Sequence, residues 1–228
     1  MSSCARSSNE SEPAGLSPAG FFAGFLQENE RTRGQERKIM EMENARRGER
    51  MERHGLLIVH TGDGKGKTTA AMGLAVRAWG DGLRVLILQF IKGGWQTGER
   101  HAIEVLARAE GRIELRPLGL GFTRKGEKPK EEHRRAAEAA LKMAADELQS
   151  GRWDMVILDE VNYAVRFGLI TEEELGALLE RRPPEVHLVC TGRAACPLLM
   201  ERADLITEMR SLRHPFAAGI KAQKGIEF

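Results

Sequence analysis

Apolar and polar positions alternate along the chain in blocks, and these blocks predict short buried strands separated by helices. Most of the predicted strands are continuous apolar runs, which are typical of strands buried on both faces of a parallel sheet. Further along, the segment LITEMRSL (205–212) follows the last predicted helix. The predicted strands cover 55–61, 84–90, 112–118, 153–160 and 185–193.

Between the strands, apolar residues recur at helical spacing. Thr171 and Glu174 have the spacing of a capping box, which predicts where one helix begins. Because strands alternate with helices, we expect an α/β fold with a mostly parallel sheet and helices on both faces. The first predicted helix begins at about residue 67. The others cover 99–109, 129–151, 171–183 and 197–203.

The first 54 residues have a different pattern, so we divide the chain into an N-terminal extension (1–54) and a domain (55–228). Residues 1–27 mix small residues with three phenylalanines, and we expect them to be largely disordered. Residues 28–53 alternate acids and bases with almost no apolar face. They are interpreted either as a solvated helix or as an arm that docks over an active site.

The amino-acid composition excludes few classes of function. The formal net charge is +2, with acids and bases mixed along the chain, and this gives no indication of a nucleic-acid or membrane partner. Three scattered cysteines fit a reducing compartment, and Cys190 is expected in the core. The apolar stretch 19–27 is too short to span a bilayer and has no basic segment before it. We therefore expect a cytoplasmic protein.

The strongest chemical signal is the segment TGDGKGKT, residues 61–68. It has the phosphate-binding pattern G-x-x-x-x-G-K-[ST], except that Thr61 stands where the first glycine is usual. Gly62, Gly64 and Gly66 are expected to allow positive-φ turns that aim backbone N–H groups at an anion. The segment therefore predicts a phosphate-binding loop.

The residues after these glycines add charge and a metal ligand. A helix that begins at about Lys67 brings the positive end of its dipole to the same anion. Lys67 supplies a mobile ammonium group, and the Thr68 hydroxyl is suited to bind a metal ion that is held by the phosphates.

Two further segments are expected at the ligand-binding edge of the sheet. Asp159 and Glu160 end a buried strand, where one carboxylate would complete a magnesium site with Thr68; the sequence leaves open which of the two binds the metal directly. The segment 89–100, which contains Lys92, is either a second ligand loop or a glycine-rich connection.

The sequence contains no motif for a protein nucleophile. The six histidines have no metal-ligand spacing, and there is no G-x-S-x-G. The pattern indicates a protein that binds and positions a nucleotide. Three functions remain open from the loop: a group transfer in which triphosphate leaves, a small-molecule kinase or ATPase, and a nucleotide-binding regulatory module.

Several segments of the chain resemble the corrinoid adenosyltransferases of the CobA/BtuR type. They occur in the same order as in that family and together span about residues 55–228. The most distinctive are QFIKGGWQTGER (89–100) and the C-terminal AGIKAQKGIEF (218–228). The resemblance implies a P-loop NTPase-like (RecA-like) fold. It implies an alkyl transferase that moves the 5′-deoxyadenosyl group of ATP to Co(I) of a reduced corrinoid and releases triphosphate.

The resemblance also implies roles for particular residues. Mg²⁺, or Mn²⁺ in its place, is assigned to Thr68 with Glu160 and Asp159, and Phe122 is assigned to the lower face of the corrinoid. Arg124 stands where the family commonly has tryptophan, so this sequence departs from the family pattern at the lower face. The ATP site is assigned to Gly62, Asp63, Gly64, Lys65, Gly66, Lys67, Thr68, Thr69 and Arg193.

The resemblance implies partners as well. We expect a homodimer in which the charged arm lies over the active site, and a flavoprotein-type reductant for the cobalt.

Overall fold

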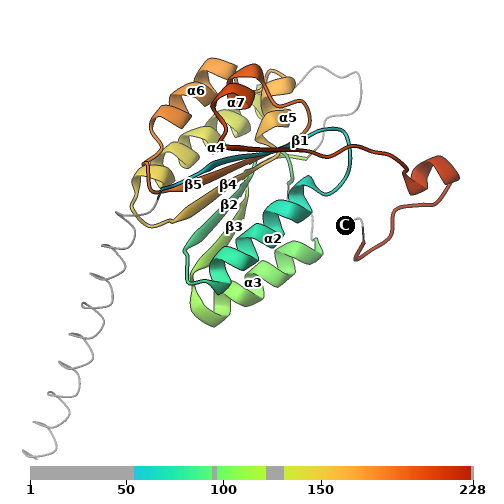
Figure 1. Cartoon of the computed structure of the whole chain (residues 1–228), viewed down its shortest axis with the longest axis horizontal. Coiled ribbons are helices and arrows are strands. Elements are labelled where there is room, and N and C mark those ends of the chain that lie inside the picture. Colours follow the sequence, from blue (N-terminus) through green and yellow to red (C-terminus); the bar gives the residue numbers. More distant parts are fainter. Residues whose placement is uncertain (1–53, 94–96, 122–130, 227–228) are drawn as a thin grey trace, which may run out of the picture. The chain divides into compact units, whose positions relative to one another are not determined.

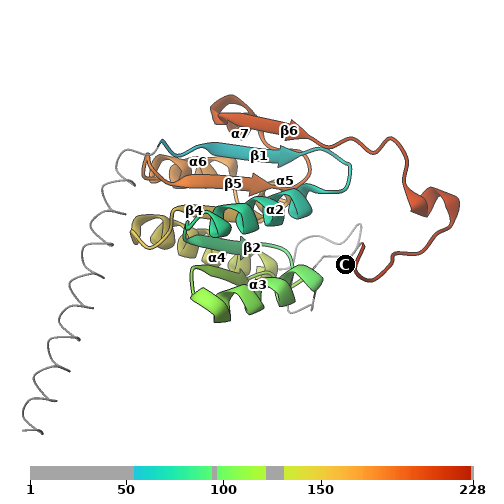
Figure 2. The same ribbon diagram turned by 60° about the horizontal axis from the view of Figure 1, so that its bottom comes forward.

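The computed structural model describes residues 54–93, 97–121 and 131–226. Its strands form one six-stranded parallel sheet in the order β3-β2-β4-β5-β1-β6, which can be followed in Figures 1 and 2. The strands are β1 (Leu57–Thr61), β2 (Val85–Gln89), β3 (Ile113–Pro117), β4 (Met155–Asp159), β5 (His187–Thr191) and β6 (Leu205–Glu208).

Helices cover both faces of the sheet (Figure 1). Helices α2 (Lys67–Gly80) and α3 (Gly98–Glu110) lie on one face. The other face carries α4 (Glu131–Gln149), α5 (Val161–Arg166), α6 (Glu172–Glu180) and α7 (Pro197–Arg202), and a short 3₁₀ helix η1 (Pro215–Ala218) follows β6. This arrangement confirms the predicted α/β fold, with a parallel sheet and helices on both faces.

The burial of the strands follows the apolar runs. All five residues of β1, β2 and β4 are buried, as expected for strands with helices above and below. By contrast, β6 is an edge strand whose four residues are all exposed. Cys190 in β5 is fully buried, as predicted, and burial raises the pKa of its thiol to about 12.

Within the described residues, each predicted strand and helix is present, with ends that differ by a few residues. The capping box is confirmed, because Thr171 Oγ1 accepts from the Glu174 N–H at 3.1 Å and Glu174 Oε2 accepts from the Thr171 N–H at 2.7 Å. Helices α5 and η1 were not predicted from the sequence. Nearly all of the extension (1–54) lies outside the described residues, so that division stays a prediction.

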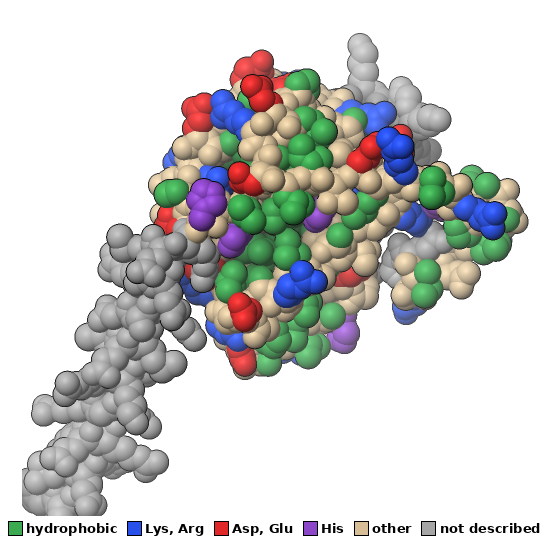
Figure 3. Space-filling model, in the orientation of Figure 1, with side chains coloured by type: hydrophobic (Ala, Val, Ile, Leu, Met, Phe, Trp, Pro, Cys, Tyr) green, Lys and Arg blue, Asp and Glu red, His purple; other side chains and the backbone are tan. Residues whose placement is uncertain are grey.

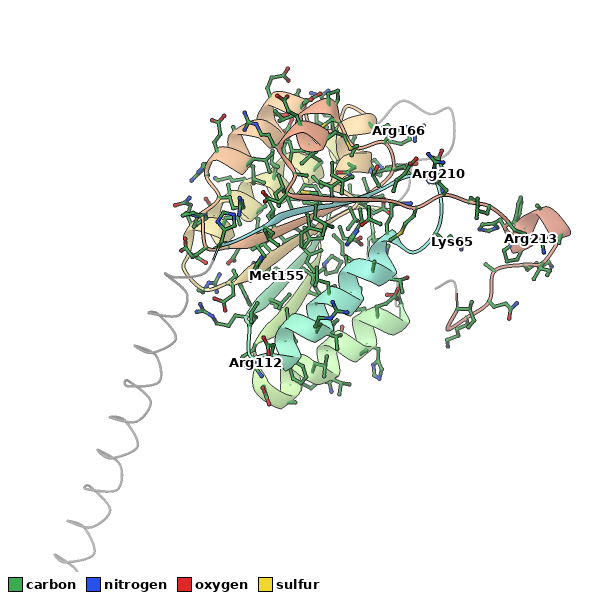
Figure 4. All side chains as sticks on the ribbon, in the orientation of Figure 1. Lys65, Arg112, Met155, Arg166, Arg210 and Arg213 are labelled. Carbon is green, nitrogen blue, oxygen red and sulfur yellow. The ribbon has the colours of Figure 1, made fainter. Side chains whose placement is uncertain are left out.

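Parallel pairing brings the carboxyl ends of β1, β4 and β5 together at one edge of the sheet. In Figure 4, Lys65, Arg166 and Arg210 lie at this carboxyl edge, whereas Arg112 and Met155 lie at the opposite end. The predicted phosphate loop and the acidic pair therefore meet at the edge where parallel sheets bind ligands.

An apolar groove of about 620 Å³ lies at the amino edge, between α2 and the first residues of β1, β4 and β5. In the view of Figure 3, hydrophobic side chains gather near the centre of the domain. The groove contains none of the predicted site residues. Among the described residues, no helix is long and apolar enough to cross a membrane.

The buried side chain of His60 has a ring nitrogen without a hydrogen-bond partner. His60, near the end of β1, is 8% exposed, and its Nδ1 has no hydrogen-bond partner. Burial lowers the pKa of His60 below its ordinary value of 6.5. The unfolded chain therefore binds the proton more readily than the folded chain, and stability is lost as the pH falls through the unfolded-state pKa.

We expect His60→Phe to raise the free energy of unfolding at pH 7 by about 1 kcal/mol, because it removes an unsatisfied buried nitrogen. The variant should also lose less stability than the wild type between pH 7 and pH 5, as measured by urea denaturation at both values. His101→Gln, which changes an exposed histidine of α3, is the control. An equal acid-induced loss in His60→Phe and wild type would contradict the assignment.

Candidate functional site

The phosphate loop joins β1 to α2 and has left-handed backbone at two of its glycines. Gly62 has φ 92° and Gly66 has φ 108°, and Gly66 is the N-cap of α2. Glycine is needed at both positions because other L-residues rarely adopt this conformation. The first turn of α2 leaves backbone N–H groups without helical partners, and together with the helix dipole they form an anion site.

The structure gives Gly64 a different role from the predicted positive-φ turn. Gly64 has no left-handed φ; instead its N–H donates to the Met209 carbonyl at 2.7 Å. A Cβ at Gly64 would lie 2.7 Å from that same oxygen. Met209, just after β6, also donates its N–H to the Thr61 carbonyl at 2.9 Å. The C-terminal segment thus packs backbone against backbone on the loop.

Thr61, which replaces the usual first glycine, is buried and anchors the base of the loop. Its hydroxyl accepts a hydrogen bond from the Ala195 N–H at 3.1 Å. Ala195 belongs to the connection after β5, two residues beyond Arg193. Thr61 therefore ties the phosphate loop to the segment that carries a predicted ATP-binding arginine.

Lys67 is turned back onto its own loop. Its ammonium donates to the Gly62 carbonyl at 2.7 Å and to the Gly64 carbonyl at 2.5 Å. Burial lowers the pKa of Lys67, and the Arg193 charge lowers it further, while Glu160 and Asp63 oppose the shift. The two loop carbonyls thus satisfy this cation.

Asp159 at the end of β4 is the central polar contact of the site, and its side chain is fully buried. Its Oδ1 accepts from the hydroxyls of Thr68 and Thr191, each at 2.8 Å. Its Oδ2 accepts from Gln89 Nε2 at 3.0 Å and lies 3.4 Å from Lys92 Nζ. Four side chains therefore hold one carboxylate, as a buried charge requires.

Gln89 and Thr191 were not predicted as site residues from the sequence. Both are the last residue of a strand that neighbours β4, and Gln89 is paired in register with Asp159. A polar residue that ends an apolar run was the available signal. Its partner could not be named without the strand order.

Glu160 follows Asp159 with left-handed backbone, φ 65°, and its N–H donates to Thr191 Oγ1 at 2.9 Å. Such backbone is unusual for a residue other than glycine and is often found at functional sites. Burial raises the pKa of Glu160, and the Asp159 charge adds to the rise, whereas Lys92, Lys67 and Arg193 oppose it.

These elements surround a pocket of about 420 Å³. Most of the predicted ATP residues line it, as does Glu160. Asp63 and Asp159 directly precede lining residues in the chain, and Gly62 lies two residues before the lining residue Gly64. Phe122 lies outside the described residues. The lining residues are Gly64, Lys65, Gly66, Lys67, Thr68, Thr69, Lys92, Glu99, Glu160, Tyr163, Arg193 and Ile226.

The oxygen atoms at the pocket floor suit a hard cation. In the part of the chain that the structure describes, no group of three or more His, Cys, Asp or Glu side chains could hold a metal ion. The Thr68 hydroxyl and the carboxylates of Asp159 and Glu160 instead provide a few oxygen donors beside an anion site. Mg²⁺ commonly binds in this way, with water and phosphate oxygens completing its octahedron.

Comparisons with known proteins match most of the chain. Residues 53–228 match the family described as ATP:corrinoid adenosyltransferase BtuR/CobO/CobP. A corrinoid adenosyltransferase of Pseudomonas aeruginosa is 41% identical over 177 residues, which are 78% of this chain and 85% of that protein. The corrinoid adenosyltransferase CobA of Salmonella typhimurium is 37% identical over 205 residues, covering 88% of this chain and 99% of its own.

Among solved structures, the flagellar accessory protein FlaH from Methanocaldococcus jannaschii has a TM-score of 0.48 and 14% identity. That match covers 68% of this chain and 71% of FlaH.

The contact between Gly64 and Met209 predicts the effect of one added methyl group. Gly64→Ala should lower the free energy of unfolding by about 1–3 kcal/mol, because the new Cβ meets backbone that cannot move aside easily. It should also weaken ATP binding, because the loop must shift. Urea denaturation and calorimetric titration with ATP measure the two effects.

Gly73→Ala is the matched control. Gly73 is exposed within α2, and a Cβ there would meet nothing within 4 Å. This variant should be more stable than the wild type by about 0.5–1 kcal/mol, because alanine favours the helix. Wild-type stability in Gly64→Ala would show that the loop tolerates a side chain against Met209.

Proposed function

Because the chain belongs to the BtuR/CobO/CobP family of ATP:corrinoid adenosyltransferases, we propose that its phosphate loop holds the triphosphate of ATP as a leaving group. The protein is a transferase that adenosylates corrinoids with ATP. In this reaction Co(I) of the reduced corrinoid attacks C5′ of the ribose. The Co–C bond forms, the C5′–O bond breaks, and triphosphate leaves with the bonding electrons.

The observation that carries this proposal is the composition of the pocket. Its described lining combines the N-terminus of α2 with Lys65, Lys67 and Arg193, and includes no Ser, Cys or His. The lining is therefore rich in groups that bind a polyanion, and within it there is no serine, cysteine or histidine to act as a nucleophile. A reaction whose nucleophile is the cobalt of the substrate needs nothing more from these residues.

The protein's contribution is electrostatic. Negative charge grows on the bridging oxygen as the C5′–O bond breaks. Fixed N–H groups and ammonium groups near this oxygen stabilise the transition state more than the ground state. Lys67 would leave the carbonyls of Gly62 and Gly64 for the phosphate oxygens, because a charge-assisted contact is stronger than one with a neutral carbonyl.

We assign Mg²⁺, or Mn²⁺ in its place, to the oxygens of Thr68 and Glu160. The Thr68 hydroxyl donates its hydrogen to Asp159 Oδ1, with 2.8 Å between the two oxygens. The lone pairs of the Thr68 oxygen are therefore left for a metal ion. Glu160 lines the pocket, whereas the buried Asp159 carboxylate is engaged by four side chains. Asp159 would therefore orient Thr68. When bound, the metal ion would neutralise part of the charge on the departing triphosphate.

The corrinoid is assigned to the side of the pocket nearest the connection after β3. The connection after β3 contacts the connection after β2: the Gly121 N–H donates a hydrogen bond to the Ile91 carbonyl at 2.9 Å. It continues to Phe122 and Arg124. We propose that Phe122 contacts the lower face of the corrinoid, with Arg124 in place of the tryptophan that is common in the family.

An assay with chemically reduced corrinoid and Mg–ATP, without oxygen, tests the function. We expect adenosylcorrinoid, followed by absorbance, together with inorganic triphosphate. ADP as the product would favour a kinase or ATPase, and no turnover would favour a regulatory module. Lys67→Ala should reduce turnover by at least about 10²-fold, the usual effect of losing one transition-state contact. Near-normal activity of this variant would contradict the loop assignment.

We also propose a cytoplasmic homodimer that receives its electron from a flavoprotein-type reductant. The exposed edge strand β6 supports the dimer: Leu205 is 45% exposed and Ile206 is 38% exposed. Large exposed apolar side chains on an edge strand are commonly covered by another chain.

Sedimentation equilibrium of the full chain should give twice the chain mass of 25.3 kDa. Leu205→Glu should weaken the dimer, because a carboxylate would be buried without a partner. Val105→Glu, which changes an exposed apolar residue of α3, serves as the control. A monomer at every protein concentration would exclude the homodimer.

A further inference from the structure

Lys92 makes two contacts that the adenosyl transfer does not explain. It lies three residues beyond the end of β2, and its side chain is 22% exposed. Its ammonium is 3.4 Å from Asp159 Oδ2 and 3.5 Å from Thr68 Oγ1. The same side chain lines the pocket together with Lys67 and Glu160. Lys92 thus lies between the buried carboxylate and the space proposed for ATP.

The Lys92 ammonium lies beside the Thr68 hydroxyl, one of the two groups assigned to the metal ion. Thr68 gives its hydrogen to Asp159, so a cation beside Thr68 Oγ1 must approach the remaining lone pairs, where the Lys92 ammonium lies. Two cations cannot share this place, because they repel each other strongly so close to a buried site. Binding of the metal therefore requires Lys92 to move.

The ammonium also has a clear role before any ligand binds. Asp159 is fully buried, and a buried carboxylate without a compensating charge is costly. Its other three partners, Gln89, Thr191 and Thr68, are neutral. In the described site Lys92 is the cation in contact with this carboxylate, so it balances the charge until a metal ion arrives.

We propose that Lys92 holds the place of the metal ion in the nucleotide-free enzyme and moves to the triphosphate when Mg–ATP binds. The proposal rests on the proposed function and adds a catalytic residue to it. Metal binding would free the ammonium at the moment when phosphate oxygens become available. Its flexible four-carbon stem allows the move without a change of backbone.

Lys67 supports the same behaviour. Both lysines line the pocket, and both are satisfied by protein oxygens: Lys67 by the carbonyls of Gly62 and Gly64, Lys92 by Thr68 and Asp159. Phosphate oxygens are stronger acceptors than the neutral carbonyls that hold Lys67. For Lys92, a metal ion beside Thr68 would take over the balance of the Asp159 charge and so release the ammonium. Two cations would therefore be exchanged from the protein to the polyanion in one binding event.

The test uses Lys92→Met, which keeps much of the stem and removes the charge. First, nucleotide-free protein is titrated with Mn²⁺, and free Mn²⁺ is followed by electron paramagnetic resonance. We expect the variant to bind Mn²⁺ about tenfold more tightly than the wild type, because the competing cation is gone. Second, binding of inorganic tripolyphosphate in the presence of Mg²⁺ is measured by calorimetry. We expect it to be about tenfold weaker, because one cation is lost.

Lys142→Met, which removes an exposed lysine from α4, is the control and should change neither affinity. Lys92→Gln is the second variant, because an amide can still donate to Asp159 if Lys92→Met does not fold; the same two changes are expected. Unchanged Mn²⁺ affinity in the soluble variant overturns the place-holding role. Unchanged tripolyphosphate affinity overturns the move to the triphosphate.

Neither titration involves corrinoid chemistry. If the wild type forms no adenosylcorrinoid when it is given reduced corrinoid and Mg–ATP, the proposed function fails. The two titrations still decide separately whether Lys92 exchanges with a metal ion.

Discussion

The site depends on one buried carboxylate. Asp159 ends β4 in the middle of the sheet, where water cannot reach it, so its charge must be met by the protein. Its partners come from the end of β2, the end of β5 and the first turn of α2. One group therefore fixes the ends of three neighbouring strands relative to the helix that begins at the phosphate loop. The contacts of Asp159 therefore constrain both the register of the central strands and the geometry of the site.

A second constraint comes from the far end of the chain. The Met209 backbone hydrogen-bonds to Gly64 and Thr61, although almost 150 residues separate them in the sequence. The strand β6 holds this segment in place by pairing with β1. The loop that binds phosphate is thus shaped partly by residues that follow the last strand. Its glycines serve both the anion and this close approach of two backbones.

The sequence predicted those parts of the structure that depend on local pattern. Buried strands, helix caps and the loop follow from residue type and spacing, and Thr68 and Asp159 were placed at one edge because parallel strands share their direction. The contacts of Gln89, Thr191 and Lys92 depend on strand order, which no local pattern contains. Gly64 was predicted to have a positive φ because glycine often has one. The structure instead shows that glycine is needed there because the Met209 backbone lies too close for a side chain.

Two cations of the site are held by oxygens of the protein itself, and this affects how the site can bind ATP. Lys67 is held by loop carbonyls, and Lys92 balances Asp159. Binding of a metal–nucleotide complex would therefore exchange partners, and would not bring new charges together. Each ammonium group that binds a phosphate oxygen must first leave a protein oxygen, so affinity is lower than the number of cations suggests. The same exchange favours a ligand that brings both a metal ion and a polyanion, because the metal ion would balance Asp159 while the polyanion binds the ammonium groups. A site of this kind can release triphosphate after transfer, since the protein oxygens are ready to take the two ammonium groups back.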